Sequence, residues 1–204
     1  PCVPLIDEDQ PLVPTNPYGE SKLVIERTLA WLGRSHGLRW AALRYFNAAG
    51  ASADGTLGED HRPETHLVPI VLEVARGKRD AVHVFGIDYD TPDGTCLRDY
   101  VHVCDLADAH LAAIDALDEH ESLALNLGCG QGRSVREIVR VARDVTGRPI
   151  PTVDAPRREG DPPVLVADPS RAEQILGWKA TRSDPHTIIE SAWRFHETHP
   201  EGYA

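Results

Sequence analysis

The stretch from residue 16 to residue 50, NPYGESKLVIERTLAWLGRSHGLRWAALRYFNAAG, decides the fold. Its opening pair, Asn16-Pro17, is typical of a helix N-cap followed by proline at the first helical position. An apolar stripe then continues to His36-Gly37, where the glycine ends the predicted helix. Residues 40–46, WAALRYF, predict a buried strand. A helix that leads directly into a buried strand is a building unit of α/β proteins.

The rest of the chain continues this alternation of helices and strands. A strand at 123–127, a helix at 135–146 and a strand at 150–153 predict a βαβ unit. Asp105 is expected to cap a helix that runs toward Leu117. The whole pattern predicts an α/β protein with a largely parallel sheet. The other predicted elements are a helix at 65–76, a strand at 82–85, and helices at 170–176 and 186–199.

Composition and charge narrow the possible function classes. The 204 residues are 41% hydrophobic and 26% charged, which is ordinary for a soluble globular protein. The net charge of −11 argues against binding to nucleic acid or to an anionic membrane surface. No apolar run approaches the ~20 residues that span a bilayer. None of the four cysteines forms a C-x-x-C pair, so we expect free thiols in a reducing cytoplasm.

The segment Tyr18-Gly-Glu-Ser-Lys22 is the sharpest chemical signal. A spacing of four on a helix places the phenol and the ammonium on one face. The lysine cation favours the phenolate form of the tyrosine, which can then act as a base. The same spacing also arises by chance in helices. The preceding Asn16-Pro17 and the following Arg44-Tyr-Phe-Asn47 favour the catalytic interpretation.

A glycine-rich stretch, Gly128-Cys-Gly-Gln-Gly132, lies between a predicted strand and a predicted helix, as a dinucleotide-binding loop does. Neither possible register supplies the third glycine, because Arg133 or Val135 stands in its place. Ser134 and Glu137 instead have the spacing of a capping box. We therefore expect a structural role for this loop.

Three residues are candidate metal ligands: His61, Glu64 and His66. They include neither a helical i, i+4 histidine pair nor a cysteine partner. We therefore expect that they bind no metal.

Six motifs occur along the chain in this order: Asn16–Lys22, Arg44–Gly50, Phe85-Gly86, Thr91–Val103, Asn126–Gly130 and Pro156–Asp161. In kind and order they resemble the motifs of UDP-glucose (UDP-galactose) 4-epimerases, which belong to the extended short-chain dehydrogenase/reductase family. The resemblance runs over essentially the whole chain. It implies the C-terminal part of a Rossmann-type parallel sheet plus a smaller α/β substrate-binding domain.

The resemblance also implies a role for individual residues. Tyr18 is the expected general base and acid on the sugar 4-hydroxyl, and Lys22 the expected ligand of the nicotinamide ribose of NAD. Tyr45 and Phe46 are expected to flank the nicotinamide. The residues implied in binding the UDP-sugar are Asn47, His66, Leu67, Phe85, Arg98, Arg158, Asp161 and Leu165.

The chemistry of these side chains suits the implied UDP-sugar site. The guanidinium groups of Arg98 and Arg158 suit a pyrophosphate, and the carboxylate of Asp161 suits ribose hydroxyls. Phe85 is expected to pack against uracil. Leu165 aligns with the position that limits the size of the sugar 2-substituent. The alternatives are arginines that merely solvate the surface and a phenylalanine that fills an ordinary core.

The resemblance also divides the chain. Residues 1–50 are the expected remnant of an NAD-binding Rossmann domain. Residues 51–204 are mainly the UDP-sugar domain, with some segments returning to the Rossmann sheet. The family's glycine-rich NAD loop and a catalytic Ser or Thr are expected upstream of Pro1. We therefore expect this chain to be inactive alone, and the intact enzyme to be a cytoplasmic homodimer that uses the helix bearing Tyr18.

Three alternative functions stay open at this point. The first is a 4,6-dehydratase of the same family, which also oxidises a sugar nucleotide. The second is an epimerase of another UDP-sugar, such as an N-acetylated one. The third is a UDP-sugar-binding fragment without catalytic activity.

Overall fold

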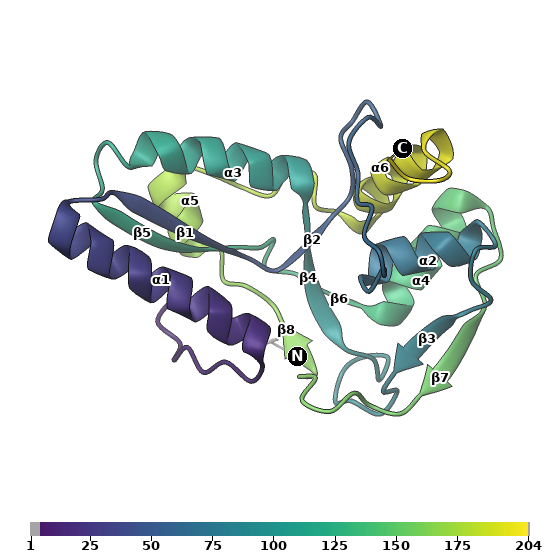
Figure 1. Cartoon of the computed structure of the whole chain (residues 1–204). Coiled ribbons are helices and arrows are strands. Elements are labelled where there is room, and N and C mark those ends of the chain that lie inside the picture. The colour runs from purple at the N-terminus through teal and green to yellow at the C-terminus, as the bar shows by residue number, and fades with distance from the viewer. Residues whose placement is uncertain (1–4, 204) are drawn as a thin grey trace.

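The computed structural model describes residues 5–203 and has an α/β architecture with two lobes side by side (Figure 1). The predicted fold class is confirmed, since four of the five strand pairs in the described residues are parallel. The helices are α1 (Pro17–His36), α2 (Leu67–Ala75), α3 (Val103–Ala116), α4 (Val135–Thr146), α5 (Ser170–Leu176) and α6 (Pro185–Thr198). The strands are β1 (Trp40–Tyr45), β2 (Asn47–Ala49), β3 (Val82–Phe85), β4 (Leu97–His102), β5 (Ser122–Leu127), β6 (Gly132–Ser134), β7 (Thr152–Ala155) and β8 (Val164–Leu165).

The first lobe consists of the parallel pair β1–β5 with α1 on one side and α3 on the other (Figure 1). As predicted, Asn16 caps α1, because its side-chain oxygen accepts a hydrogen bond of 2.9 Å from the Gly19 amide. The core of this lobe includes the fully buried Leu125 and Leu127, with Trp178 packed beside them. Segments that follow Gly50 in the chain, namely α3, β5 and α5, thus share one core with β1.

The second lobe consists of α2, α4 and α6 packed on one another, with the parallel pair β3–β7 at its outer edge (Figure 1). Its core includes Leu72, Ile138 and Ile188, one from each helix, and all three are fully buried. Burying such side chains stabilises the lobe by about 2 kcal/mol each.

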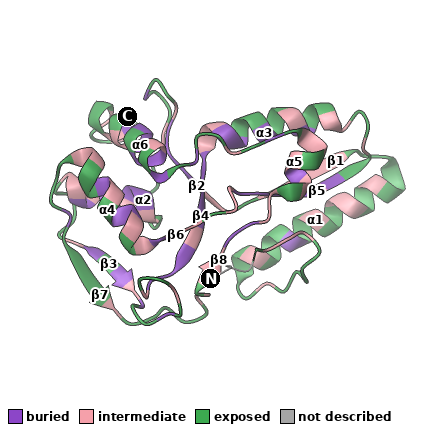
Figure 2. Cartoon of the chain, turned by 180° about the vertical axis from the view of Figure 1, so that it is seen from behind, coloured by how far each residue is buried: buried purple, intermediate pink, exposed green. Residues whose placement is uncertain are grey.

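Strand β4 lies between the lobes and pairs with β2 and β8 in parallel and with β6 in antiparallel orientation. Successive side chains of a strand point to opposite faces. Accordingly, Tyr100 belongs to the core of the second lobe and Val101 to the core of the first. Figure 2 shows the burial along this strand, in contrast to the largely exposed α1.

Three predictions about local structure were wrong. The strand predicted to be buried, β1, is only half-buried, and its last residue, Tyr45, is exposed. The predicted βαβ unit does not form, since β5 pairs with β1 in one lobe and β7 pairs with β3 in the other. Asp105 does not cap α3, because His102 does so by accepting a hydrogen bond from the Cys104 amide. Asp105 is instead buried and accepts hydrogen bonds from the Arg182 amide and the Ser183 hydroxyl. The sequence pattern of a carboxylate near a helix start fits either role.

Among residues 5–203, no helix combines the length and the apolar character that crossing a membrane requires.

Candidate functional site

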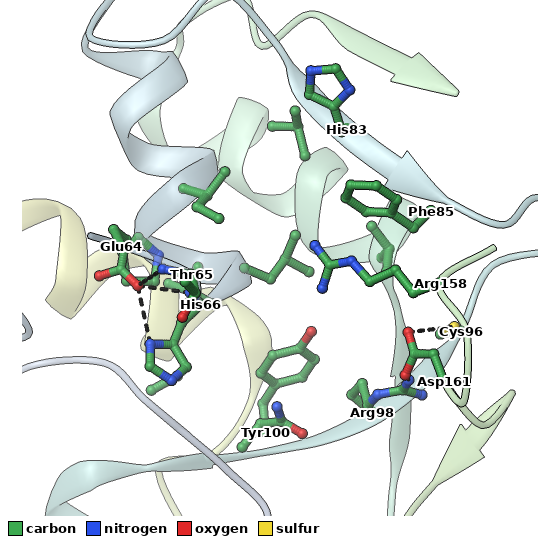
Figure 3. Close-up of a pocket in the computed structure, with 18 of the residues that line it drawn as sticks. Glu64, Thr65, His66, His83, Phe85, Cys96, Arg98, Tyr100, Arg158 and Asp161 are labelled. Atoms are coloured by element: carbon green, nitrogen blue, oxygen red, sulfur yellow. Dashed lines mark hydrogen bonds and ion pairs between the residues drawn. The ribbon is translucent and has the colours of Figure 1, made fainter. Parts of the chain in front are cut away.

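A cavity of about 580 Å³ lies in the second lobe between the start of α2, strands β2 to β4 and the segment at 156–161 (Figure 3). This volume is within the ~300–1,000 Å³ range of small-molecule sites. Seven of the eight residues predicted to bind a UDP-sugar line it: Asn47, His66, Leu67, Phe85, Arg98, Arg158 and Asp161.

Arg98 is held firmly in the cavity wall. One of its terminal nitrogens donates to the Asp161 carboxylate, and the other donates to the Leu97 carbonyl at 2.9 Å. The Arg98 side chain is only 12% exposed. A guanidinium that is partly shielded from water attracts an anion more strongly than one on the open surface. Its shielded, fixed position excludes the alternative that this arginine merely solvates the surface.

Arg158 and Phe85 form another part of the wall (Figure 3). The guanidinium carbon of Arg158 lies 4.0 Å from the centroid of the Phe85 ring, a cation–π arrangement. Among residues 5–203, the Arg158 side chain has no ion-pair or hydrogen-bond partner, which leaves its donors available to a ligand. Phe85 is only half-buried and borders the cavity, so ordinary core packing does not account for it.

Arg157 fixes the segment that carries Arg158 and Asp161. Arg157 donates to the Asp88 carboxylate at 2.7 Å and covers the Tyr89 ring, with its guanidinium carbon 4.2 Å from the ring centroid. The hydrogen bond to Asp88 raises the pKa of Arg157, and that from Arg157 lowers the pKa of Asp88. The segment at 156–161 is thereby tied to the loop that follows β3.

The predicted catalytic pair lies outside the cavity, in the first two turns of α1. The Lys22 ammonium is 4.9 Å from the centroid of the Tyr18 ring, so the two side chains share a face as expected. Tyr18 is 73% exposed. Within residues 5–203, neither side chain is hydrogen-bonded or ion-paired with another side chain. Both groups are therefore presented outward.

Tyr45 and Phe46 connect this region to the cavity. Tyr45 is the last residue of β1 and is half-exposed, and Phe46 follows it. The next residue, Asn47, opens β2 and lines the cavity. The predicted cofactor residues and the predicted substrate residues are therefore contiguous in the chain at the carboxyl end of β1, where ligands of α/β sheets bind.

Leu165 is the one predicted substrate residue that the structure does not bring into the cavity. It lies in β8, half-buried and in register with Arg98 of β4. Its proposed effect on the sugar 2-substituent stays a prediction.

The glycine-rich stretch has a structural role, as predicted. The buried carboxylate of Asp99 accepts hydrogen bonds from the Cys129 amide at 2.9 Å and from the Gly130 amide at 3.1 Å. Burial raises the pKa of Asp99. A Cβ atom on Gly128 would lie 2.5 Å from the same carboxylate, which explains the glycine there. The amides that a phosphate would need are thus already hydrogen-bonded to Asp99, a residue that the sequence did not single out.

Comparisons with known proteins show the family to which this chain belongs. Residues 2–128 match the sequence model of the NAD dependent epimerase/dehydratase family. The chain belongs to this family. Its Tyr18-Gly-Glu-Ser-Lys22 segment and most of the residues that line the cavity lie within the matched residues.

Individual members of the family are similar over almost the whole chain. The UDP-glucose 4-epimerase of Halalkalibacterium halodurans is 52% identical over 200 residues, which are 98% of this chain and 60% of that protein. A crystal structure of a UDP-glucose 4-epimerase superposes with a TM-score of 0.96 at 51% identity, covering 99% of this chain and 62% of the other. That of the Bifidobacterium longum UDP-glucose 4-epimerase in complex with NAD⁺ and UDP superposes with a TM-score of 0.91 at 42% identity, covering 98% and 60% of the two chains.

The chain spans about 60% of the length of the curated relatives it matches.

Proposed function

We propose that this chain carries the UDP-sugar site and the catalytic Tyr–Lys pair of a UDP-glucose 4-epimerase. The observation that carries the proposal is the cavity, which brings together seven predicted UDP-sugar residues from five separate segments. The Bifidobacterium longum relative, whose structure is described as a complex with NAD⁺ and UDP, supports the same ligands here. The reaction is the reversible interconversion of UDP-glucose and UDP-galactose.

Within the cavity, each side chain has a distinct task. Arg98 and Arg158 hold the two phosphates, since a guanidinium offers several donors to phosphate oxygens. The Phe85 ring packs on the uracil. The second oxygen of the Asp161 carboxylate, whose neighbour is the Cys96 thiol at 3.9 Å, remains to accept from a ribose hydroxyl. The diphosphate charge is thus met by two cations, only one of which is already paired with a carboxylate.

The residues at the start of α1 and the end of β1 fit the cofactor that the family name implies. Lys22 presents an unpaired ammonium to a ribose, and the half-exposed Tyr45 and neighbouring Phe46 present aromatic faces to a nicotinamide. NAD, when bound, supplies a reversible acceptor for the hydride on C4 of the sugar. The glycine-rich stretch at 128–132 does not supply a loop for the NAD phosphates, because its Cys129 and Gly130 amides are hydrogen-bonded to Asp99.

Tyr18 handles the proton. As the general base, it would accept the proton of the sugar 4-hydroxyl when C4 is oxidised. Once C4 had been reduced from its opposite face, Tyr18 would give the proton back to the oxygen. The sugar thus ends with inverted configuration at C4 and no net redox change.

We also propose that the enzyme is a cytoplasmic homodimer that associates through α1. The free thiols Cys96, Cys104 and Cys129 suit a reducing compartment. The outer face of α1 exposes Val24, Ile25 and Trp31, and Trp31 is 66% exposed. Apolar side chains gathered on one helix suit contact with a second copy.

Two measurements test the proposal. The first is titration of residues 1–204 with UDP by calorimetry, where Arg98→Ala should weaken binding by at least about tenfold. The matched control is Arg39→Ala, which removes an exposed ion pair with Asp118 at the other end of the molecule. Equal affinity for UDP in all three proteins would remove the cavity as the nucleotide site.

The second measurement is incubation of the complete protein that contains this chain with UDP-galactose and NAD, followed by NMR of the sugar nucleotides. Appearance of UDP-glucose supports the epimerase. A 4-keto-6-deoxy sugar would identify a dehydratase instead, and absence of any conversion would contradict the catalytic proposal while leaving the UDP site to be judged by the titration. Residues 1–204 alone are expected to bind UDP without turning the sugar over.

A further inference from the structure

A cluster of four side chains lies just before α2, at the rim of the cavity. Glu59, His61, Glu64 and His66 each offer one ligand atom, and these atoms all lie within 4.8 Å of one another. The sequence drew attention to three of these residues and not to Glu59. The absence of a helical histidine pair argued against a metal there, but the loop at 59–66 folds the four groups together without a helix.

The distances within the cluster are short. The Nδ1 atom of His66 lies 2.7 Å from the Glu59 carboxylate and 3.0 Å from the Glu64 carboxylate. The Nδ1 atom of His61 lies 3.0 Å from the same oxygen of Glu59. Ligand atoms around a tetrahedral zinc ion are about 3.4 Å apart, given metal–ligand distances of about 2.1 Å. Small outward movements of these side chains therefore suffice to admit an ion.

The negative charges of the Glu59 and Glu64 carboxylates are only partly compensated by hydrogen-bond donors around them. Glu64 is 5% exposed and Glu59 is 21% exposed at the side chain. The Nδ1 atom of His66 carries at most one hydrogen and yet faces an oxygen of each carboxylate. The site thus holds more lone pairs than hydrogens to share among them.

Glu64 has part of its hydrogen bonding satisfied by the chain itself. One of its oxygens accepts from the Thr65 and His66 amides, each at 2.7 Å. These bonds fix the direction of the Glu64 carboxylate, as groups around the ligands of a metal site do. The cluster is therefore partly ordered before any ion enters.

We propose that Glu59, His61, Glu64 and His66 form a binding site for a divalent transition-metal ion of the zinc class. Two imidazoles with two carboxylates suit Zn²⁺, whereas Mg²⁺ and Ca²⁺ prefer oxygen ligands alone. Since Glu64 and His66 also line the cavity and His66 is the N-cap residue of α2, the ion secures the cavity wall at Leu67. This proposal does not depend on the proposed epimerase reaction.

The test uses the protein after treatment with a chelator and dialysis. Titration with ZnCl₂, followed by removal of free ion and elemental analysis, should give about one zinc ion per chain. Glu59→Gln and His61→Ala should each weaken zinc binding by at least about tenfold, since even removal of an outer partner of a metal ligand costs that much. His83→Ala is the matched control, because His83 lines the cavity but lies outside the cluster.

Two further readouts separate this site from other zinc binding. Zinc should raise the unfolding temperature of the wild type and of His83→Ala, and not that of Glu59→Gln. Co²⁺ in place of zinc should give visible absorption bands without the strong thiolate charge-transfer band expected if Cys96, Cys104 or Cys129 bound it. Zinc binding that is absent, or equal in Glu59→Gln and wild type, would show that the cluster is only a histidine–carboxylate hydrogen-bond network.

Discussion

At the scale of single residues, the roles proposed for the exposed Tyr18 and the shielded Arg98 are separable. Replacing Tyr18 by Phe removes the proposed proton acceptor and changes no residue that lines the cavity. In the complete protein, turnover of UDP-galactose should fall by about 10²- to 10⁴-fold, while the affinity for UDP stays unchanged. The measurement is kcat by coupled assay alongside UDP titration, with Tyr203→Phe as control. Near-normal turnover in Tyr18→Phe would exclude the tyrosine from the mechanism.

The sequence predicted the site residues whose chemistry is visible in a local motif, and it missed those whose role depends on distant partners. The cavity arginines and Phe85 stand in recognisable motifs, and the cavity includes them. Asp99 and Glu59 are ordinary acidic residues in the sequence. Asp99 accepts a hydrogen bond from the Cys129 amide, and Glu59 contacts His61 and His66. Only the folded chain creates these contacts, so the sequence did not reveal them.

At Gly128, the structure leaves no room for a Cβ atom. A Cβ atom there would lie 2.5 Å from the Asp99 carboxylate and 2.4 Å from the Cβ of Ala167. Gly128→Ala should therefore lower the free energy of unfolding by about 2 kcal/mol or more. Urea denaturation checks this, with Gly77→Ala as control. An added Cβ at Gly77 meets nothing within 4 Å and costs only about 1 kcal/mol of backbone strain.

At the scale of elements, α6 couples stability to pH through His196. Burial, aided by the charge of Arg76, lowers the pKa of His196 to about 4 in the folded protein. In the unfolded chain, histidine titrates near ~6.5. Between these values only the unfolded chain binds the proton, so the free energy of unfolding should fall as pH drops from about 6.5 toward 4. Above pH 6.5 this contribution to stability is fully present.

Denaturant titrations at several pH values test this dependence. His196→Gln should make the free energy of unfolding less dependent on pH between 6.5 and 4. If the free energy of unfolding of His196→Gln depended on pH as steeply as that of the wild type, His196 would not be the group responsible.

The sequence predicted elements whose signals are local and failed where pairing is between distant segments. α1, α4 and α5 were predicted nearly to the residue, because caps and apolar periodicity mark them. β4 was not predicted as a strand, since charged Arg98 and Asp99 interrupt its apolar pattern. β5 and β7 were predicted to belong to one βαβ unit. They instead pair with β1 and β3 in different lobes, and the sequence pattern does not show such long-range pairing.

At the scale of the whole molecule, the apolar face of α1 predicts association. Trp31→Glu should lower the apparent mass seen by analytical ultracentrifugation, because a charge at the centre of an apolar contact is costly. Leu111→Glu on the exposed face of α3 is the matched control, with similar exposure on a different helix. Equal association in both variants would place the contact elsewhere.

The position of β4 has a consequence for how the molecule melts. Tyr100 and Val101 are neighbours on this strand, yet each is buried in the core of a different lobe. Losing the strand therefore opens both cores together, and neither lobe keeps its interior while the other is disordered. A scanning calorimeter should record a single heat-absorption peak whose van't Hoff enthalpy equals the calorimetric one. The two lobes unfold as one cooperative unit, so a substitution that destabilises either core lowers the free energy of unfolding of the whole molecule.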